Sequence, residues 1–207
     1  MTTDLRIRVL QEDDWDGVVA LEERAYAASG LSEGREALRS RHRASPDTCF
    51  VLEHAGGLGG YLLALPYPLF QCPDLSRAEA GGVRATNMHL HDLVVAEELR
   101  GRRLAHRMLR GLEETARARG YRTMSLVAVR GSQVVWAPLG YRARPEIGLP
   151  GSYGPEALYM AKPLSPAASP AAVAAPAASP AAVQAAIQAL TPSTDPSLGF
   201  PPRAEVG

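Results

Sequence analysis

The sequence predicts one α/β domain followed by a tail of different composition, on three observations. Short apolar runs alternate with longer stretches whose apolar residues recur every three or four positions, as on one helix face. A strand, a helix and a second strand follow one another between His89 and Val129, which favours a right-handed crossover. After Pro163 the chain turns to Ser, Pro and Ala, with too little large apolar surface for a core. We therefore expect a domain at residues 1–162 and a Pro/Ala-rich disordered tail at residues 163–207.

Composition limits the class of protein. The chain has 207 residues, with 22 basic and 22 acidic side chains and no net charge, so nothing global indicates nucleic acid or an anionic membrane. Its 2 cysteines make no disulfide framework, as is typical of a reducing compartment. The N-terminus lacks a secretion signal, and no apolar run has the length of a membrane span. We expect a soluble cytoplasmic protein.

In the first half of the chain, periodicity and turn residues define the elements. Residues 71–86 show few signals of a helix or a strand and are expected to form a loop. The whole stretch Pro66–Asn87 is long enough to act as a lid. The other expected elements are a strand at Leu5–Leu10, a helix at Asp14–Ala27, a helix from a cap at Ser32 to Ser45-Pro46, and a hairpin of Thr48–His54 and Gly60–Leu65.

The second half begins with the strand His89–Val95, which ends in apolar residues apart from Asp92 and is expected inside the sheet. Apolar residues then trace one face of a helix over Arg102–Arg119, with Gly120 as its C-cap. The remaining expected elements are a strand at Arg122–Val129, a short helix around Ser132–Ala137 and a strand at Leu158–Ala161.

The segment Met88–Ala105 combines a strand that ends in polar side chains with a turn and a basic, glycine-containing helix start. The first N–H groups of a helix have no partner within it, and they lie at the positive end of its dipole. Such a terminus binds anions such as pyrophosphate. The strand before it carries His89, His91 and Asp92, which can accept protons. One segment thus offers a phosphate site beside a site for proton transfer.

Two motifs resemble the GNAT superfamily of N-acetyltransferases over roughly residues 4–162. The run Arg100-Gly-Arg-Arg-Leu-Ala105 is similar to the family's Arg/Gln-x-x-Gly-x-Gly/Ala, whose backbone amides hold the pyrophosphate of acetyl-CoA. Arg103 occupies the first glycine position, and we expect its guanidinium to add a phosphate contact. The resemblance implies acetyl-CoA as co-substrate and a mixed, mostly antiparallel central sheet flanked by helices.

The second motif, Trp136-Ala-Pro-Leu-Gly-Tyr141, is similar to the family's Tyr-x-x-Leu-Gly-Phe. Trp136 stands where many members have the tyrosine proposed to protonate the leaving thiolate. An indole donates a hydrogen bond but supplies no proton at neutral pH. Since a thiol of pKa about 8.5 leaves readily as thiolate, the reaction remains feasible without that tyrosine.

The resemblance also implies roles for individual residues. His89-x-His91 resembles the histidine pair of the arylalkylamine N-acetyltransferases, and Asp92 matches the position of the glutamate base in the histone-acetylating branch. On a regular strand His89 and His91 share one face and Asp92 faces the other, so all three line one pocket only if the strand bulges or twists. The expected cofactor-binding residues are Leu93, Val94, Val95, Arg100, Gly101, Arg102, Arg103, Leu104, Ala105, His106 and Trp136.

Plainer interpretations stay open beside these roles. His89 and His91 would then be ordinary residues at the end of a strand, with no catalytic role. Asp92 would cap a neighbouring turn or pair with an arginine. The histidine pair lacks an evident third ligand, so no metal site is expected. The arginines around Arg102 lack interleaved aromatic residues, so no nucleic-acid site is expected.

The sequence therefore predicts an enzyme that moves an acetyl group from acetyl-CoA to a primary amine of a small molecule, of arylalkylamine or polyamine type. Two alternatives remain: an acetyltransferase acting on protein N-termini or lysines, and a non-catalytic acyl-CoA-binding module. The sequence leaves open whether the chain is a monomer or a homodimer.

Overall fold

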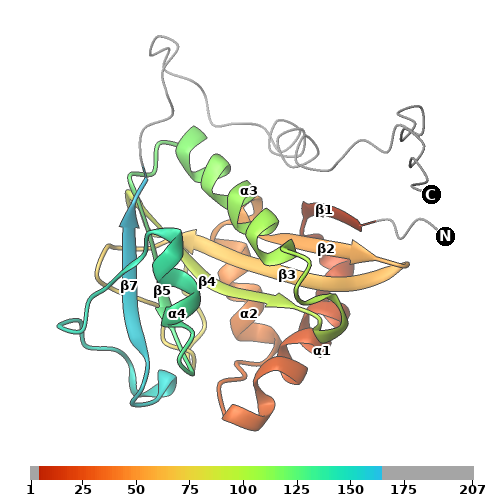
Figure 1. Ribbon diagram of the computed structural model, residues 1–207, viewed down its shortest axis with the longest axis horizontal. Helices are drawn as coiled ribbons and strands as arrows, with labels where there is room; N and C mark the ends of the chain where they lie inside the picture. The colour runs from red at the N-terminus through yellow and green to blue at the C-terminus, as the bar shows by residue number, and fades with distance from the viewer. Residues whose placement is uncertain (1–4, 165–207) are drawn as a thin grey trace, which may run out of the picture.

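A seven-stranded sheet in the order β1-β2-β3-β4-β5-β7-β6 forms the centre of the molecule (Figure 1). The computed structural model describes residues 5–164, so most of the expected tail lies outside the described residues. Strands β4 and β5 are parallel, and the other neighbouring strands are antiparallel. This confirms the mixed, mostly antiparallel sheet. The strands are β1 (Leu5–Val9), β2 (Phe50–His54), β3 (Gly57–Pro66), β4 (Asn87–Val95), β5 (Thr123–Ala128), β6 (Arg142–Ala143) and β7 (Leu158–Pro163).

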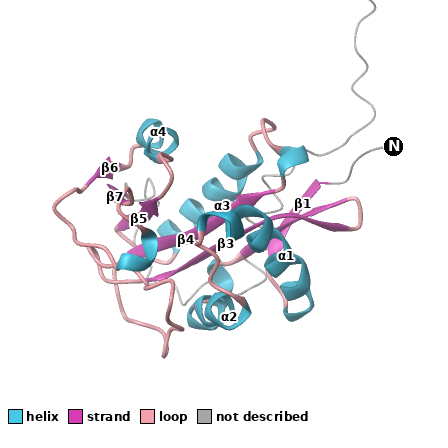
Figure 2. Ribbon diagram, turned by 90° about the horizontal axis from the view of Figure 1, so that it is seen from below, coloured by secondary structure: helices cyan, strands magenta, loops and turns pink. Residues whose placement is uncertain are grey.

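Helices cover both faces of this sheet (Figures 1 and 2). Helices α1 (Trp15–Tyr26) and α2 (Arg35–Ala44) lie on one face, and α3 (Leu104–Ala118) lies on the other. The short helix α4 (Gln133–Trp136) follows β5. The predicted apolar stripe of α3 is confirmed, because it buries Leu104, Met108, Leu109, Leu112 and Ala116. Short 3-10 turns lie at Glu12–Asp14, Ala27–Ser29, Pro46–Thr48, Glu97–Leu99, Ala137–Leu139 and Gly151–Tyr153.

Two predicted boundaries are wrong. The hairpin turn contains only Ala55 and Gly56, whose φ angles are 49° and 80°, and β3 begins at Gly57 instead of Gly60. Positive φ at both turn residues gives the twist that matches a two-residue hairpin. Helix α2 begins after Gly34, not after a cap at Ser32, because the Ser32 hydroxyl donates instead to the Glu22 carboxylate at 2.6 Å.

The two parallel strands pair over only part of their length. Residues Asn87–Leu90 of β4 pair with Thr123–Leu126 of β5, and beyond Leu90 β4 continues along β3 alone. Buried side chains join the paired part: the Asn87 amide donates to the Ser125 hydroxyl at 2.8 Å, and His89 Nδ1 lies 3.0 Å from the same oxygen. The sheet is therefore closed at one end of these strands and open at the other.

Strand β4 carries a bulge at the point where the two strands separate. Leu63 of β3 pairs with Asp92, whereas the next residue, Ala64, pairs with Leu90. His91 is therefore the extra residue on β4. A bulge changes the phase of the side chains that follow it. From the sequence, His89, His91 and Asp92 were expected to line one pocket only if the strand bulged or twisted. A bulge is present at His91.

Gly60 allows β3 to approach β4 closely beside the separated strands. A Cβ atom at Gly60 would lie 2.7 Å from the Val94 carbonyl oxygen and 3.4 Å from the Val95 Cα. Both neighbours belong to the backbone, which cannot move aside as a flexible side chain can. We expect Gly60→Ala to lower the free energy of unfolding by about 2 kcal/mol in urea titrations.

Gly57→Ala is the matched control, since a Cβ there meets only the His54 carbonyl oxygen, at 3.9 Å. It should change the stability by less than about 0.5 kcal/mol. Equal effects of the two substitutions would show that the close approach at Gly60 is unimportant.

Candidate active site

A cleft of about 380 Å³ opens between β4 and β5 beyond their last pair. Its walls come from β4, β5, α1, the turn before α3 and the segment around α4, so that five parts of the chain meet there. The lining residues are Tyr26, Leu90, His91, Asp92, Leu93, Arg100, Leu126, Val127, Val129, Arg130, Ser132 and Trp136.

A smaller pocket of about 60 Å³ adjoins this cleft and shares five of its residues. The shared residues are Tyr26, His91, Asp92, Val127 and Val129. The pocket also contains two further carboxylates, and we call it the acidic pocket. Its other lining residues are Glu22, Leu31, Glu33, Leu75 and Tyr153.

Asp92 lies at the junction of the cleft and the acidic pocket. The Tyr26 hydroxyl donates to its Oδ1 at 2.6 Å, and the Tyr61 hydroxyl donates to its Oδ2. Burial raises the pKa of Asp92 from 3.8 to about 6, because a buried carboxylate loses its hydration, and the two tyrosine hydrogen bonds offset this effect only in part. Asp92 is therefore a base that is ionised at neutral pH and weakly acidic when protonated.

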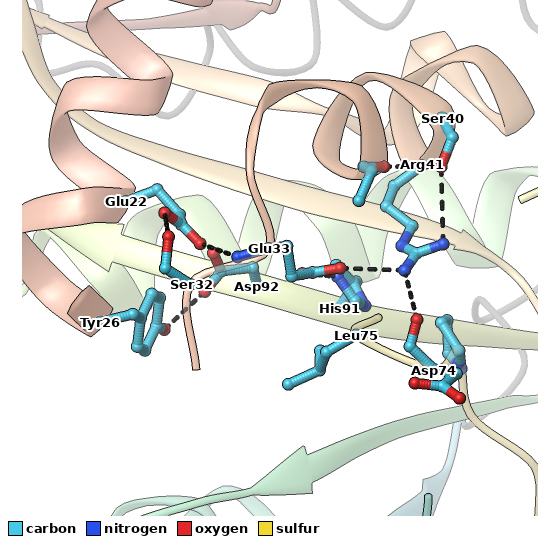
Figure 3. A network of polar contacts seen from close by, with 12 residues as sticks. Glu22, Tyr26, Ser32, Glu33, Ser40, Arg41, Asp74, Leu75, His91 and Asp92 are labelled. Atoms are coloured by element: carbon cyan, nitrogen blue, oxygen red, sulfur yellow. Dashed lines mark hydrogen bonds and ion pairs between the residues drawn. The ribbon is translucent and has the colours of Figure 1, made fainter. Parts of the chain in front are cut away.

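His91 lies in a buried network of charges on the other side of the pocket (Figure 3). Its Nε2 is 2.5 Å from Oε1 of Glu33, and the other carboxylate oxygen of Glu33 accepts a hydrogen bond from Arg41 at 2.9 Å. Burial alone would raise the pKa of Glu33, but the neighbouring His91 and Arg41 more than offset it, and the pKa is lowered. Glu33 is thus held as a carboxylate and holds the imidazole of His91 in place.

Arg41 joins this network to the long loop between β3 and β4. Its side chain is fully buried, and it donates to the Glu79 carboxylate at 3.0 Å and to the Asp74 carbonyl oxygen at 2.8 Å. The Tyr153 hydroxyl donates to the Pro73 carbonyl oxygen at 2.9 Å. The loop that the sequence indicated as a lid is therefore tied down beside the acidic pocket, which it lines through Leu75.

The three candidate bases separate into two groups. His91 and Asp92 come together, since both line the cleft and the acidic pocket. His89 is fully buried and is not among the described residues that line either space. Its ring stacks on Tyr159 at a centroid distance of 6.4 Å, and burial lowers its pKa well below 6.5, so the ring is neutral. These contacts give His89 a packing position in the paired part of the sheet.

The expected cofactor-binding residues are distributed over three places. Leu93, Arg100 and Trp136 line the cleft, where the Trp136 indole donates to the Ser132 hydroxyl at 3.3 Å. Val94 and Val95 line a neighbouring hollow of about 150 Å³, which shares Arg100 with the cleft. The remaining residues, Gly101, Arg102, Arg103, Leu104, Ala105 and His106, form the turn and the first residues of α3.

Arg103 has a left-handed backbone, with φ 58° and ψ 20°. This conformation costs a residue with a Cβ about 1 kcal/mol and costs glycine almost nothing. The position therefore favours glycine, and in this chain Arg103 adopts the left-handed conformation instead. Arg103 is exposed at the start of α3, as a phosphate contact would require.

Sequence reasoning missed Glu22, Glu33, Arg41 and Tyr61. Glu22 carried a signal, since it lies one turn before Tyr26 and four residues after Val18 on the buried face of α1, where a carboxylate needs a partner. That partner is the segment after α1: the backbone N–H of Glu33 donates to Glu22 at 2.8 Å. Glu33 and Arg41 contact each other. Their further partners, His91 for Glu33 and the loop residues Asp74 and Glu79 for Arg41, lie far along the chain, and no local pattern indicates them.

Residues 5–164 contain neither a metal-binding cluster nor a helix that could span a membrane. This part of the chain contains no group of three His, Cys, Asp or Glu residues arranged to hold a metal ion. No helix within it has the length and apolar character needed to cross a membrane.

Comparison with known proteins gives one family match. The model described as "Acetyltransferase (GNAT) family" matches residues 15–141. Comparison with curated proteins finds no match.

Solved structures with the same fold include three informative examples. The GphF GNAT-like decarboxylase in complex with isobutyryl-CoA is 21% identical, with a TM-score of 0.65 over 77% of this chain and 100% of that chain. The loading GNATL domain of CurA from Lyngbya majuscula is 14% identical, with a TM-score of 0.65 over 78% of this chain and 98% of that chain. A GNAT family acetyltransferase from Brucella melitensis in complex with acetyl-CoA is 18% identical, with a TM-score of 0.55 over 79% of this chain and 90% of that chain. At these identities the matches establish the fold.

The raised pKa of Asp92 predicts that this residue destabilises the protein at high pH. The folded protein binds the proton more tightly than the unfolded chain does, so the contribution to stability is full below pH 3.8 and is lost as the pH rises through about 6. We expect Asp92→Asn to raise the free energy of unfolding by on the order of 3 kcal/mol at pH 8, and by about half as much at pH 5, which lies between the two pKa values.

Urea titrations at the two pH values measure this difference. Glu33→Gln is the control of opposite sign, because the pKa of Glu33 is lowered and its ionised form stabilises the fold. If Asp92→Asn lowered the stability equally at both pH values, Asp92 would not have a raised pKa.

Proposed function

Because this chain belongs to the GNAT acetyltransferase family, we propose that it transfers the acetyl group of acetyl-CoA to a primary amine of a small molecule. One observation carries the choice of acceptor. A compact pocket lined by three carboxylates, those of Glu22, Glu33 and Asp92, opens into the cleft between β4 and β5. Such a pocket suits a cation of limited size.

The cleft fits the acyl end and the arm of acetyl-CoA. Beyond Leu90, none of the described strands pairs with β4 on its β5 side, so alternate residues up to Val95 direct backbone N–H and C=O groups toward the cleft. An extended, amide-containing pantetheine arm has the groups to pair with them. The N-terminus of α3, with Arg100, Arg102 and Arg103 beside it, suits the pyrophosphate. Neighbours of the same fold have been solved with isobutyryl-CoA and with acetyl-CoA.

The acidic pocket favours a small amine over a protein. A protein N-terminus or a lysine needs an open groove for its chain, whereas Leu75 and Tyr153 form walls here. Both walls are held by hydrogen bonds between the long loop and the segment at Ser152 and Tyr153. A primary amine of pKa about 10 is an ammonium ion at neutral pH, and a carboxylate-rich site attracts it.

Acetyl transfer begins with removal of a proton from this ammonium ion. Asp92, ionised above pH about 6, accepts the proton at the junction of pocket and cleft. The neutral amine then attacks the thioester carbonyl carbon, and the bond to sulfur breaks. Trp136 lines the cleft but supplies no proton, so the thiol leaves as thiolate. Direct attack requires no nucleophile from the protein.

Asp92→Asn tests this assignment of the base. We expect kcat to fall by about 10² to 10⁴-fold, because asparagine cannot accept the proton. The wild-type kcat/KM for the amine should decline below pH about 6, where Asp92 becomes protonated. Release of CoA thiol from acetyl-CoA, with tryptamine-like amines, polyamines and N-terminal peptides as acceptors, measures both.

Acetyl-CoA affinity is the control and should not change in Asp92→Asn. Full turnover by that variant would exclude Asp92 as the base. Tight binding of acetyl-CoA by the wild type with no thiol release for any acceptor would favour a non-catalytic binding module. Release with peptides alone would favour a protein acetyltransferase.

The chain has 2 tryptophans, and only Trp136 should sense acetyl-CoA. Trp15 is 1% exposed in the core, whereas Trp136 lines the cleft. We expect acetyl-CoA to change the tryptophan fluorescence of the wild type and to leave that of Trp136→Phe unchanged, although this variant still binds in a calorimetric titration. A full fluorescence change in Trp136→Phe would place the ligand away from the cleft.

A further inference from the structure

We propose that Tyr26 is a catalytic residue, whose hydroxyl passes the proton of the acceptor amine to Asp92. This inference rests on the proposed function, because it assigns the route by which the amine loses its proton. It adds a residue of α1 to a route whose final proton acceptor, Asp92, lies on β4.

The position of Tyr26 supports a relay. Its side chain lines both the cleft and the acidic pocket, where the amine and the thioester would meet. Its hydroxyl already donates to Oδ1 of Asp92 at 2.6 Å, so the oxygen lone pairs remain available to accept from an ammonium ion. Figure 3 shows the Tyr26 hydroxyl directed at Asp92. One hydroxyl therefore connects the pocket to the carboxylate.

Tyr61 makes the matching contact without access to the pocket. It donates to Oδ2 of Asp92 from β3, but it is fully buried and is absent from the described residues that line the cleft and the acidic pocket. The two tyrosines thus stabilise the same carboxylate and differ in whether a ligand can reach them. Tyr26 can therefore relay a proton, whereas the hydrogen bond from Tyr61 only lowers the pKa of Asp92.

The surroundings keep Tyr26 neutral. Burial raises its pKa well above 10, and the negative charge of Asp92 raises it further. Tyr26 is therefore not the final proton acceptor. The groups that face Asp92 are Tyr26 and Glu22 from α1, Glu33 from the segment after it, Tyr61 from β3, and the adjacent His91. Among these, Asp92 is the carboxylate that the Tyr26 hydroxyl contacts.

The proton transfer balances as two linked steps. An N–H bond of the ammonium ion breaks and its proton bonds to the Tyr26 oxygen, while the proton of Tyr26 moves to Oδ1 of Asp92. The amine becomes neutral, Asp92 becomes a carboxylic acid, and Tyr26 is a neutral phenol before and after. The amine nitrogen then bonds to the thioester carbon, the C–S bond breaks with its electron pair on sulfur, and the second nitrogen proton neutralises the thiolate. Asp92 finally returns its proton to water.

The test compares Tyr26→Phe with Tyr61→Phe over a range of pH. Each variant loses one hydrogen bond to Asp92, so each should shift the acidic limb of kcat/KM to higher pH. Only Tyr26→Phe should also lower the plateau of the single-turnover rate at high pH, by roughly tenfold or more. Saturating acetyl-CoA and the best amine of the acceptor panel are the probes. Thermal melts establish that both variants are folded at the assay temperature.

Equal plateaus in the two variants would overturn the relay. An inactive Asp92→Asn with equal tyrosine plateaus overturns the relay alone. An active Asp92→Asn overturns the relay and the assignment of Asp92 as the base. Failure of the proposed function is a different result, since the wild type would then release no thiol with any acceptor. A second measurement uses the wild type alone. Because the relay moves two protons together, a plot of the single-turnover rate against the fraction of deuterium oxide in the solvent should be curved. A linear dependence would overturn the relay.

Discussion

The parallel strands β4 and β5 exchange backbone hydrogen bonds over four residue pairs and then separate, and the site lies where they part. Both strands stay in the sheet, because β3 pairs with β4 up to Val95 and β7 pairs with β5 up to Ala128. The separation leaves backbone polar groups that need a partner, which makes the cleft a site for an extended, hydrogen-bonding ligand. The side chains of Asn87, Ser125 and His89 hold the paired end together and so determine where the opening begins.

Two carboxylates of the acidic pocket, Asp92 and Glu33, have opposite pKa shifts because their partners differ. Asp92 receives hydrogen bonds from two neutral tyrosines, and burial leaves its pKa raised. Glu33 lies between Arg41 and His91, and its pKa is lowered. Environments that separate the pKa values of neighbouring acids assign different roles to them. Glu33 is suited to hold His91 and, through Arg41, the loop, whereas Asp92 is suited to exchange a proton.

Periodicity and turn chemistry predicted the main elements, since these depend on neighbours in sequence. The apolar face of α3 and the interior position of β4 were visible for that reason. The two-residue strand β6 was too short to give a pattern, and the start of α2 was misplaced because Ser32 bonds to Glu22 across the loop. In the site, Asp92 and His91 were candidates from the sequence, but their partners Tyr61 and Glu33 come from contacts between distant segments. His89 belonged to the same motif, and long-range packing placed it in the core.

The bulge at His91 makes the site sensitive to the length of β4 as well as to its composition. In a regular strand, consecutive residues point to opposite faces, so His91 and Asp92 could not line one pocket together. The single extra residue between Leu90 and Asp92 brings them together. Removing one residue there would restore regular pairing with β3 and turn one of the two groups away. Two chains with the same residue types in this strand can therefore differ in chemistry, if one of them lacks this insertion.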